Sequence, residues 1–158
     1  MAMVDTERVK RTQRKLRGML VAGVLDEFDG RIMGLDKEKR LRKYAKMAGS
    51  PFLFYRGSAY LFYFDATREW FPYHTPDDRP TWIQGDLHFE NFGAFRSESG
   101  RIVFDVNDFD EGYVGSYLYD LLRMTVSLAL VCRSRELPLE TQTAVAGEYL
   151  TEYVRQMR

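Results

Sequence analysis

Two stretches decide the predicted fold: 82–91, Trp-Ile-Gln-Gly-Asp-Leu-His-Phe-Glu-Asn, and 102–111, Ile-Val-Phe-Asp-Val-Asn-Asp-Phe-Asp-Glu. Each begins with a short apolar run, at 82–84 and 102–106, that predicts a β-strand, with 97–101 as a turn between the strands. Each then continues into acidic and amide side chains, which can converge on a ligand at the strand ends without disturbing the core. The two stretches therefore predict a small β-hairpin that carries a functional site.

Helical patterns lie on both sides of this hairpin. Over 4–28 the apolar residues recur at three- and four-residue steps, with Gly30 as a stop, and their predicted inward face is Leu16, Met19, Leu20, Val24 and Phe28. Asp36 is predicted to cap a second helix that ends near Ala48. The inward stripe of that helix is predicted as Leu41, Tyr44, Ala45 and Ala48.

Further along the chain, the apolar run 52–64 favours a helix over a strand pair, and 117–133 predicts a buried helix. Pro138 opens a last helix with Val145, Tyr149 and Tyr153 on one face. Three prolines predict a surface loop over 71–80. We therefore expect a mostly helical α+β chain that forms a single domain, 1–158: helical over 1–70, a loop over 71–80, and the motifs with more helices over 81–158.

The composition excludes several classes of protein. With 158 residues, 45% of them hydrophobic and 29% charged, the chain is neither low-complexity nor collagen-like. Its single cysteine, Cys132, cannot form an internal disulfide and suggests a reducing compartment. The chain contains no run of about 18 apolar residues and no apolar secretion signal at its start. These features predict a cytoplasmic protein with no membrane partner.

Carboxylate and amide oxygens in the two motifs are the ligands that Mg²⁺ prefers. Asp86, Asn91 and Asp108 therefore predict an oxygen-rich site suited to Mg²⁺, with Asp110 either behind the ligands or as an alternative ligand. The alternative is that Asp86 and Asn91 cap backbone groups in a turn and that the acidic residues after 104 form a solvated surface turn.

The spacing of these residues resembles a known catalytic core. Gly85 to Asn91 follows the pattern G-D-x-H-x-x-N, the segment 106–109 is similar to a metal motif, and Asp120 follows Asp108 by twelve residues. This arrangement resembles the aminoglycoside phosphotransferase and choline kinase branch of the kinase-like superfamily. The resemblance implies a protein-kinase-like catalytic lobe in which Asp86 is the catalytic base and Asn91 and Asp108 hold Mg²⁺ against the phosphates of ATP or another nucleoside triphosphate. Asp120 would bond the backbone of the catalytic loop.

Two more residues are candidates for cofactor binding. Arg56 lies in an aromatic run and would contact a phosphate or carboxylate; the alternative is that it stacks on Phe54 and Tyr55. His88 lies inside the motif, and the alternative for it is packing of the loop, since His74 is the other histidine of the chain and two histidines do not make a zinc site.

A closer resemblance covers roughly 40–135. The strings 47–57, 85–93 and 104–111 are similar to the bacterial domain of unknown function 2252 family. This resemblance implies a kinase-like fold and says little about the substrate, so the phosphoryl acceptor is predicted as an unidentified small-molecule or protein hydroxyl.

Phosphotransferases hold the nucleotide with a glycine-rich loop and a lysine. Here no two glycines are closer than Gly112 and Gly115, and no lysine follows Lys46. In the resembling family a glycine-rich stretch and a strand lysine lie downstream. We therefore expect that the nucleotide-binding lobe is missing and that the chain is the N-terminal portion of a longer kinase-like domain. The remainder of the chain or a partner subunit would complete the nucleotide site, so we expect the isolated chain to be inactive.

Two other functions were weighed. A non-catalytic kinase-like module would use the acidic site or its basic helices to contact a partner chain or nucleic acid; the segments 7–17 and 37–46 each sum to +5. Such runs are usually solvated helix faces, so nucleic acid is not an expected partner. A metal-dependent hydrolase would use the same carboxylates to activate water, but generally needs more His and Asp ligands.

Overall fold

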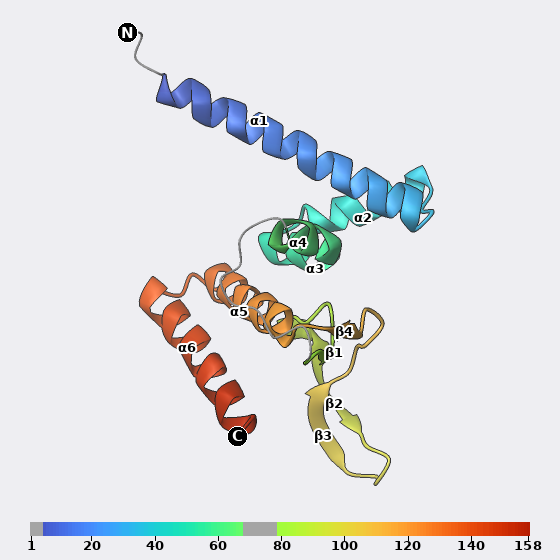
Figure 1. Ribbon diagram of the computed structural model, residues 1–158, viewed down its shortest axis with the longest axis vertical. Helices are drawn as coiled ribbons and strands as arrows, with labels where there is room; N and C mark the ends of the chain where they lie inside the picture. The colour runs from blue at the N-terminus through green and yellow to red at the C-terminus, as the bar shows by residue number, and fades with distance from the viewer. Residues whose placement is uncertain (1–4, 68–78) are drawn as a thin grey trace.

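The computed structural model describes residues 5–67 and 79–158 (Figure 1). The N-terminal part holds α1 (Thr6–Leu25), the π-helical η1 (Asp26–Ile32), α2 (Lys37–Met47), α3 (Pro51–Gly57) and α4 (Ala59–Ala66). The C-terminal part holds β1 (Thr81–Ile83), the 3₁₀ turn η2 (Phe89–Asn91), β2 (Phe92–Arg96), β3 (Ile102–Val106), β4 (Tyr113–Gly115), α5 (Tyr117–Ser134) and α6 (Leu139–Gln156). The protein is therefore mostly helical with small antiparallel sheets, which confirms the α+β class. The predicted loop over 71–80 lies outside the described residues except for its last two.

Polar side chains determine where several helices begin. Asp5 accepts the backbone N–H groups of two residues in the first turn of α1, and Asp36 accepts that of Lys39 at the start of α2. Ser50 and Ser116 make the same contact at the starts of α3 and α5. These side chains satisfy helix-terminal N–H groups that have no partner within the helix. The predicted cap at Asp36 is confirmed.

The inward face predicted for the first helix is wrong at Leu16 and Met19, whereas Leu20, Val24 and Phe28 are half-buried. Leu16 and Met19 are 59% and 62% exposed, and α1 contains no buried residue. The helix extends away from the rest of the chain in Figure 1, so its apolar side chains have no layer to pack against along most of their length. The predicted stop at Gly30 is also wrong, because a π-helical turn carries the helix on to Ile32.

The stripe predicted for the second helix is partly wrong for a related reason. Leu41 is exposed, as are Ala45 and Ala48, whereas Tyr44 is half-buried and Met47 is buried. The side of α2 that packs against α3 is therefore rotated from the one that the apolar pattern indicated.

The predicted hairpin of 82–84 with 102–106 is wrong, although both strands exist. β1 pairs with β4 in antiparallel register, Thr81 opposite Gly115, and β2 pairs with β3, Phe92 opposite Val106. The turn at 97–101 therefore joins β2 to β3. Sequence patterns missed β2 and β4 because each is short and contains a glycine, which weakens the strand signal. The functional motifs lie between these two small sheets and α5.

The core lies where α5 packs against α3, α6 and β1. Its buried apolar side chains come from both halves of the chain: Met47, Phe52, Leu61, Ile83, Leu87, Met124 and Cys132. The helices predicted over 52–64, 117–133 and from Pro138 onward are confirmed, the first as a pair broken at Ser58. Within the described residues, none of the helices has the length and apolar character needed to cross a membrane.

Candidate functional site

The loop that follows β1 is fixed by a carboxylate from α5. Asp120 Oδ2 accepts the backbone N–H of Gln84 at 2.7 Å, and Oδ1 accepts that of Gly85 at 3.1 Å. Gly85 has a φ of +87°, and a Cβ built there would lie 2.1 Å from the carbonyl oxygen of Glu111. The loop therefore needs glycine at this position, and Asp120 makes the backbone contacts that the resemblance implied for it.

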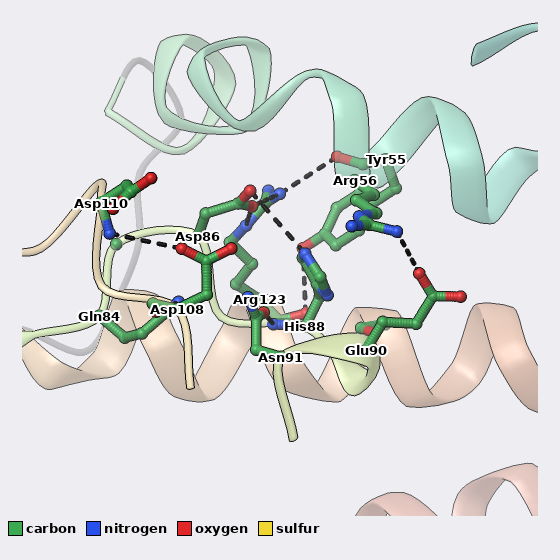
Figure 2. Close-up of polar contacts among 12 residues, drawn as sticks. Tyr55, Arg56, Gln84, Asp86, His88, Glu90, Asn91, Asp108, Asp110 and Arg123 are labelled. Carbon is green, nitrogen blue, oxygen red and sulfur yellow. Dashed lines mark hydrogen bonds and ion pairs between the residues drawn. The ribbon is translucent and has the colours of Figure 1, made fainter. Parts of the chain in front are cut away.

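Asp86 is held by a fully buried arginine (Figure 2). Arg123 is 0% exposed, and its Nε donates to Asp86 Oδ1 at 2.8 Å, while Nη2 donates to the same oxygen and to the Tyr55 carbonyl. The guanidinium also lies over the Tyr55 and Phe62 rings, with its carbon 4.4 and 5.2 Å from the ring centroids. One carboxylate oxygen of Asp86 is thus fixed, and Oδ2 lies 3.9 Å from His88 Nε2.

The environment of Asp86 makes it a stronger base than an exposed aspartate. Burial raises its pKa to about 6, with a further increase from the nearby carboxylates Glu111 and Asp108, against the opposing effect of Arg123. At neutral pH the carboxyl group is still ionised, yet it binds a proton more readily than an exposed carboxylate does. This pKa suits a group that accepts a proton near neutral pH.

His88 and Asn91 together order the loop. The backbone N–H of His88 donates to Asn91 Oδ1 at 2.7 Å, and the next backbone N–H, that of Phe89, donates to Ser127 Oγ at 2.8 Å. Both His88 and Asn91 are 2% exposed. Burial, with Arg56 and Arg123 nearby, lowers the pKa of His88 to about 4, so its imidazole is neutral at physiological pH.

A cavity of about 300 Å³ brings the predicted acidic residues together with cations. Asp86, Asp108 and Asp110 line it, and so does His88. Asp110 donates its backbone N–H to Asp108 Oδ1 at 3.4 Å, which keeps the two aspartates adjacent. Asn91 is not among the lining residues, so the structure gathers most but not all of the predicted site residues at this cavity.

The other side of this cavity is basic. It is lined by Lys43 and Lys46 from α2 and by Arg56 from α3, which also pairs with Glu90. Sequence reasoning missed the two lysines, because they lie in a charged helical run of the kind that is usually solvated. It also assigned no role to Arg123, although a signal was present: a charge inside a nearly apolar helix has to be paired when that helix is buried.

The oxygen-bearing side chains of the site supply part of what a Mg²⁺ ion requires. Within 5–67 and 79–158, no three His, Cys, Asp or Glu side chains form a group that could hold a metal ion by themselves. Mg²⁺ in phosphoryl-transfer sites is usually held by one or two carboxylates together with substrate phosphates. Asp108 and Asp110 on the cavity wall meet that requirement, and the Asn91 amide oxygen keeps a second lone pair. The residues therefore fit a Mg²⁺ ion that binds together with a phosphate-bearing ligand.

The family of the chain follows from its match to known sequences. Residues 35–158 match the family described as an uncharacterized protein conserved in bacteria (DUF2252), and the chain belongs to this family. The matched segment contains the loop after β1, the acidic segment after β3, Arg123 and both cavity lysines. No match was found among curated proteins or among solved structures.

Proposed function

We propose that this chain carries the catalytic residues of a Mg²⁺-dependent phosphotransferase that moves a phosphoryl group from a nucleoside triphosphate such as ATP to a hydroxyl group. The observation that carries the proposal is the 300 Å³ cavity, whose lining combines Asp86, Asp108 and Asp110 with the cations Lys43, Lys46 and Arg56. The resemblance of the loop to kinase-like catalytic loops supports it, and a kinase-like fold is part of the proposal.

Asp86 is the proposed proton acceptor. Arg123 holds Oδ1, so Oδ2 is the oxygen available to a substrate hydroxyl. A base with one fixed oxygen presents the other in a defined direction, which satisfies the positioning that proton transfer requires. Asp120 acts through the backbone that carries Asp86 and is a positioning residue.

The remaining residues would hold the phosphates and the metal. Asp108 and Asp110 would hold Mg²⁺ from the cavity wall, with Asn91 as a third candidate ligand. When bound, Mg²⁺ neutralises charge on the phosphates. Lys46 and Arg56 would donate to phosphate oxygens, while Lys43 keeps its ion pair with the buried Asp29. These cations would serve in place of a glycine-rich loop and a strand lysine, and further nucleotide contacts would come from the remainder of the chain or a partner subunit.

The first test is calorimetric titration with MgATP of the full-length protein, together with any partner subunit that completes the nucleotide site. We expect binding that requires Mg²⁺ and that weakens about tenfold or more in Asp108→Asn and in Lys46→Met, since each removes a charge from the lining of this cavity. The matched controls are Asp105→Asn, an exposed aspartate on β3, and Lys39→Met, an exposed lysine on α2, which should bind as the wild type does. Absence of MgATP binding, or equal affinity in all variants, would overturn the proposal.

The second test concerns the base. Asp86→Asn keeps an oxygen that accepts from Arg123 but cannot accept the substrate proton. In the full-length protein we expect turnover, measured as release of the nucleoside diphosphate, to fall about 10²- to 10⁴-fold while MgATP affinity changes little. Equal turnover in the variant and the wild type would remove Asp86 from the catalytic role.

A further inference from the structure

We infer that a second cavity, of about 750 Å³, binds the acceptor of the phosphoryl transfer, and that this acceptor is a neutral or cationic alcohol with an aromatic or aliphatic body, an inference that rests on the proposed function. The cavity lies between η1, α4 and the loop that carries Asp86. Its volume falls in the range of sites that bury a small organic ligand.

The walls of this larger cavity are mainly apolar. η1 and the residue after it contribute Phe28, Ile32 and Met33, and α4 contributes Tyr60 and Tyr63. The Phe28 and Tyr60 rings stack with their centroids 4.0 Å apart. Such walls bind the apolar body of a ligand by removing its surface from water, so the part of the acceptor that enters this space carries few polar groups.

Asp86 lies in the walls of both cavities. The two cavities share the lining residues Lys43, Arg56, Gly57, Asp86 and Glu111. The larger, apolar cavity therefore adjoins the smaller, charged cavity at the proposed base. A base for phosphoryl transfer has to reach the acceptor hydroxyl on one side while the phosphoryl donor lies on the other. A ligand in the larger cavity with its hydroxyl at Asp86 Oδ2 meets that requirement.

The charges around the larger cavity favour an acceptor without an anionic group. Lys43 is paired at 2.7 Å with Asp29, which is 0% exposed and also accepts from the Tyr60 hydroxyl at 2.8 Å. Arg56, which also lines this cavity, is paired with Glu90, and the Glu111 carboxylate adds negative charge beside Asp86. An anionic acceptor would meet this repulsion next to the base, whereas a neutral or cationic one would not.

The acceptor oxygen gives an electron pair to the γ-phosphorus, and its proton passes to Asp86 Oδ2. The bond from the γ-phosphorus to the β–γ bridging oxygen breaks, and the electron pair leaves with the nucleoside diphosphate. The products are a phosphate monoester of the alcohol and the diphosphate, and the proton on Asp86 is then released to water.

The test uses 2-(2-naphthyl)ethanol as probe, with 2-ethylnaphthalene as the analogue without a hydroxyl, and NMR saturation transfer as readout. Ala59→Trp fills the larger cavity from α4. Thr67→Trp, at the exposed end of α4, fills the cavity from its rim and replaces the first variant if that variant does not fold. Ala45→Trp, at an exposed position of α2 that lines neither cavity, is the control. We expect both compounds to bind the wild type and the control, and to lose about tenfold or more in affinity in the filled variants.

The conversion is tested with MgATP in the full-length protein, together with any partner subunit that completes the nucleotide site. We expect the wild type and the control to convert the alcohol into its phosphate monoester, detected by mass spectrometry, and the filled variants to lose this product while MgATP still binds. Absence of probe binding to the wild type, equal probe binding in the filled variants, or probe and MgATP binding without the monoester would overturn the inference. Loss of MgATP binding with intact probe binding would identify a failure of the proposed function itself, because the cavity would then bind an apolar ligand that has no phosphoryl donor.

Discussion

Two arginine–aspartate ion pairs in this protein differ in burial and, for that reason, in their structural role. Arg123 and Asp86 have side chains that are 0% and 15% exposed, whereas Arg17 on α1 and Asp65 on α4 are 50% and 37% exposed. The interior pair lies beneath the candidate site, and its arginine also donates to a backbone carbonyl. The surface pair joins α4 to a helix that contains no buried residue.

These two contacts have different consequences when broken. A buried ion has lost its hydration, so removing its partner leaves an uncompensated charge. An exposed ion regains water at once, and its attraction is weakened by solvent and salt. We therefore expect the loop and α5 to behave as one rigid unit, and α1 to be weakly coupled to it.

The largest effect is expected from Arg123→Met. It leaves the Asp86 carboxylate buried without its cation and removes a donor to the Tyr55 carbonyl, and we expect the free energy of unfolding to fall by about 3–5 kcal/mol. Urea denaturation monitored by circular dichroism measures this change. A loss below about 1 kcal/mol would show that the interior pair is no more important than a surface pair.

The next effect is on the pH dependence of stability. The pKa of Asp86, about 6, lies above its usual 3.8. Its contribution to the free energy of unfolding is therefore complete below pH 3.8 and lost as pH rises to 6. The pKa of His88, about 4, lies below its usual 6.5. Its contribution to the free energy of unfolding is therefore complete above pH 6.5 and lost as pH falls to 4. Each amounts to about 3 kcal/mol at most, and the two have opposite signs.

The wild type should therefore change little in stability between pH 4 and 6.5 on account of this pair. Asp86→Asn removes one contribution, so its stability should rise with pH over this interval, to an extent of up to about 3 kcal/mol. Denaturation at several pH values provides the measurement. A variant curve that runs parallel to that of the wild type would contradict the assigned pKa values.

A smaller effect is expected from Asp120→Ala. The backbone N–H groups of Gln84 and Gly85 lose their acceptors, at a cost of about 1–3 kcal/mol for each group that stays buried and unsatisfied. Amide hydrogen exchange should accelerate at these two residues. Asp5→Ala, which removes the exposed cap of α1, is the control and should destabilise by about 1 kcal/mol without affecting the loop.

The smallest effect is expected from Arg17→Met, which breaks the surface pair with Asp65. We expect the free energy of unfolding to change by about 0–1 kcal/mol, and this change to shrink further in high salt. A loss comparable to that of Arg123→Met would mean that α1 is an integral part of the core, which would erase the contrast between the two pairs.

Local sequence signals predicted most helices and two of the strands. Asp36 and Pro138 marked helix starts correctly, and the strand at 102–106 was found at its observed bounds, because caps and apolar runs act over a few residues. The pairing of the strands was predicted wrongly, since β1 bonds to β4 across more than 30 residues and nothing local encodes that partner. The exposure of Leu16 and Met19 was missed for the same reason. An apolar pattern predicts which face of a helix is apolar, but it does not say which element, if any, packs against that face.

By itself, the sequence determined the chemistry available here: the loop from Gly85 to Asn91, the acidic segment around Asp108, and the spacing to Asp120 identified the motif residues. The tertiary structure alone decided which of these residues meet and what faces them. It placed Arg123 against Asp86 and brought Lys43 and Lys46 of a separate helix to the same cavity. The physical reason is that burial of charge and the shape of a cavity depend on groups far apart in the chain, whose distances are fixed only when the helices pack.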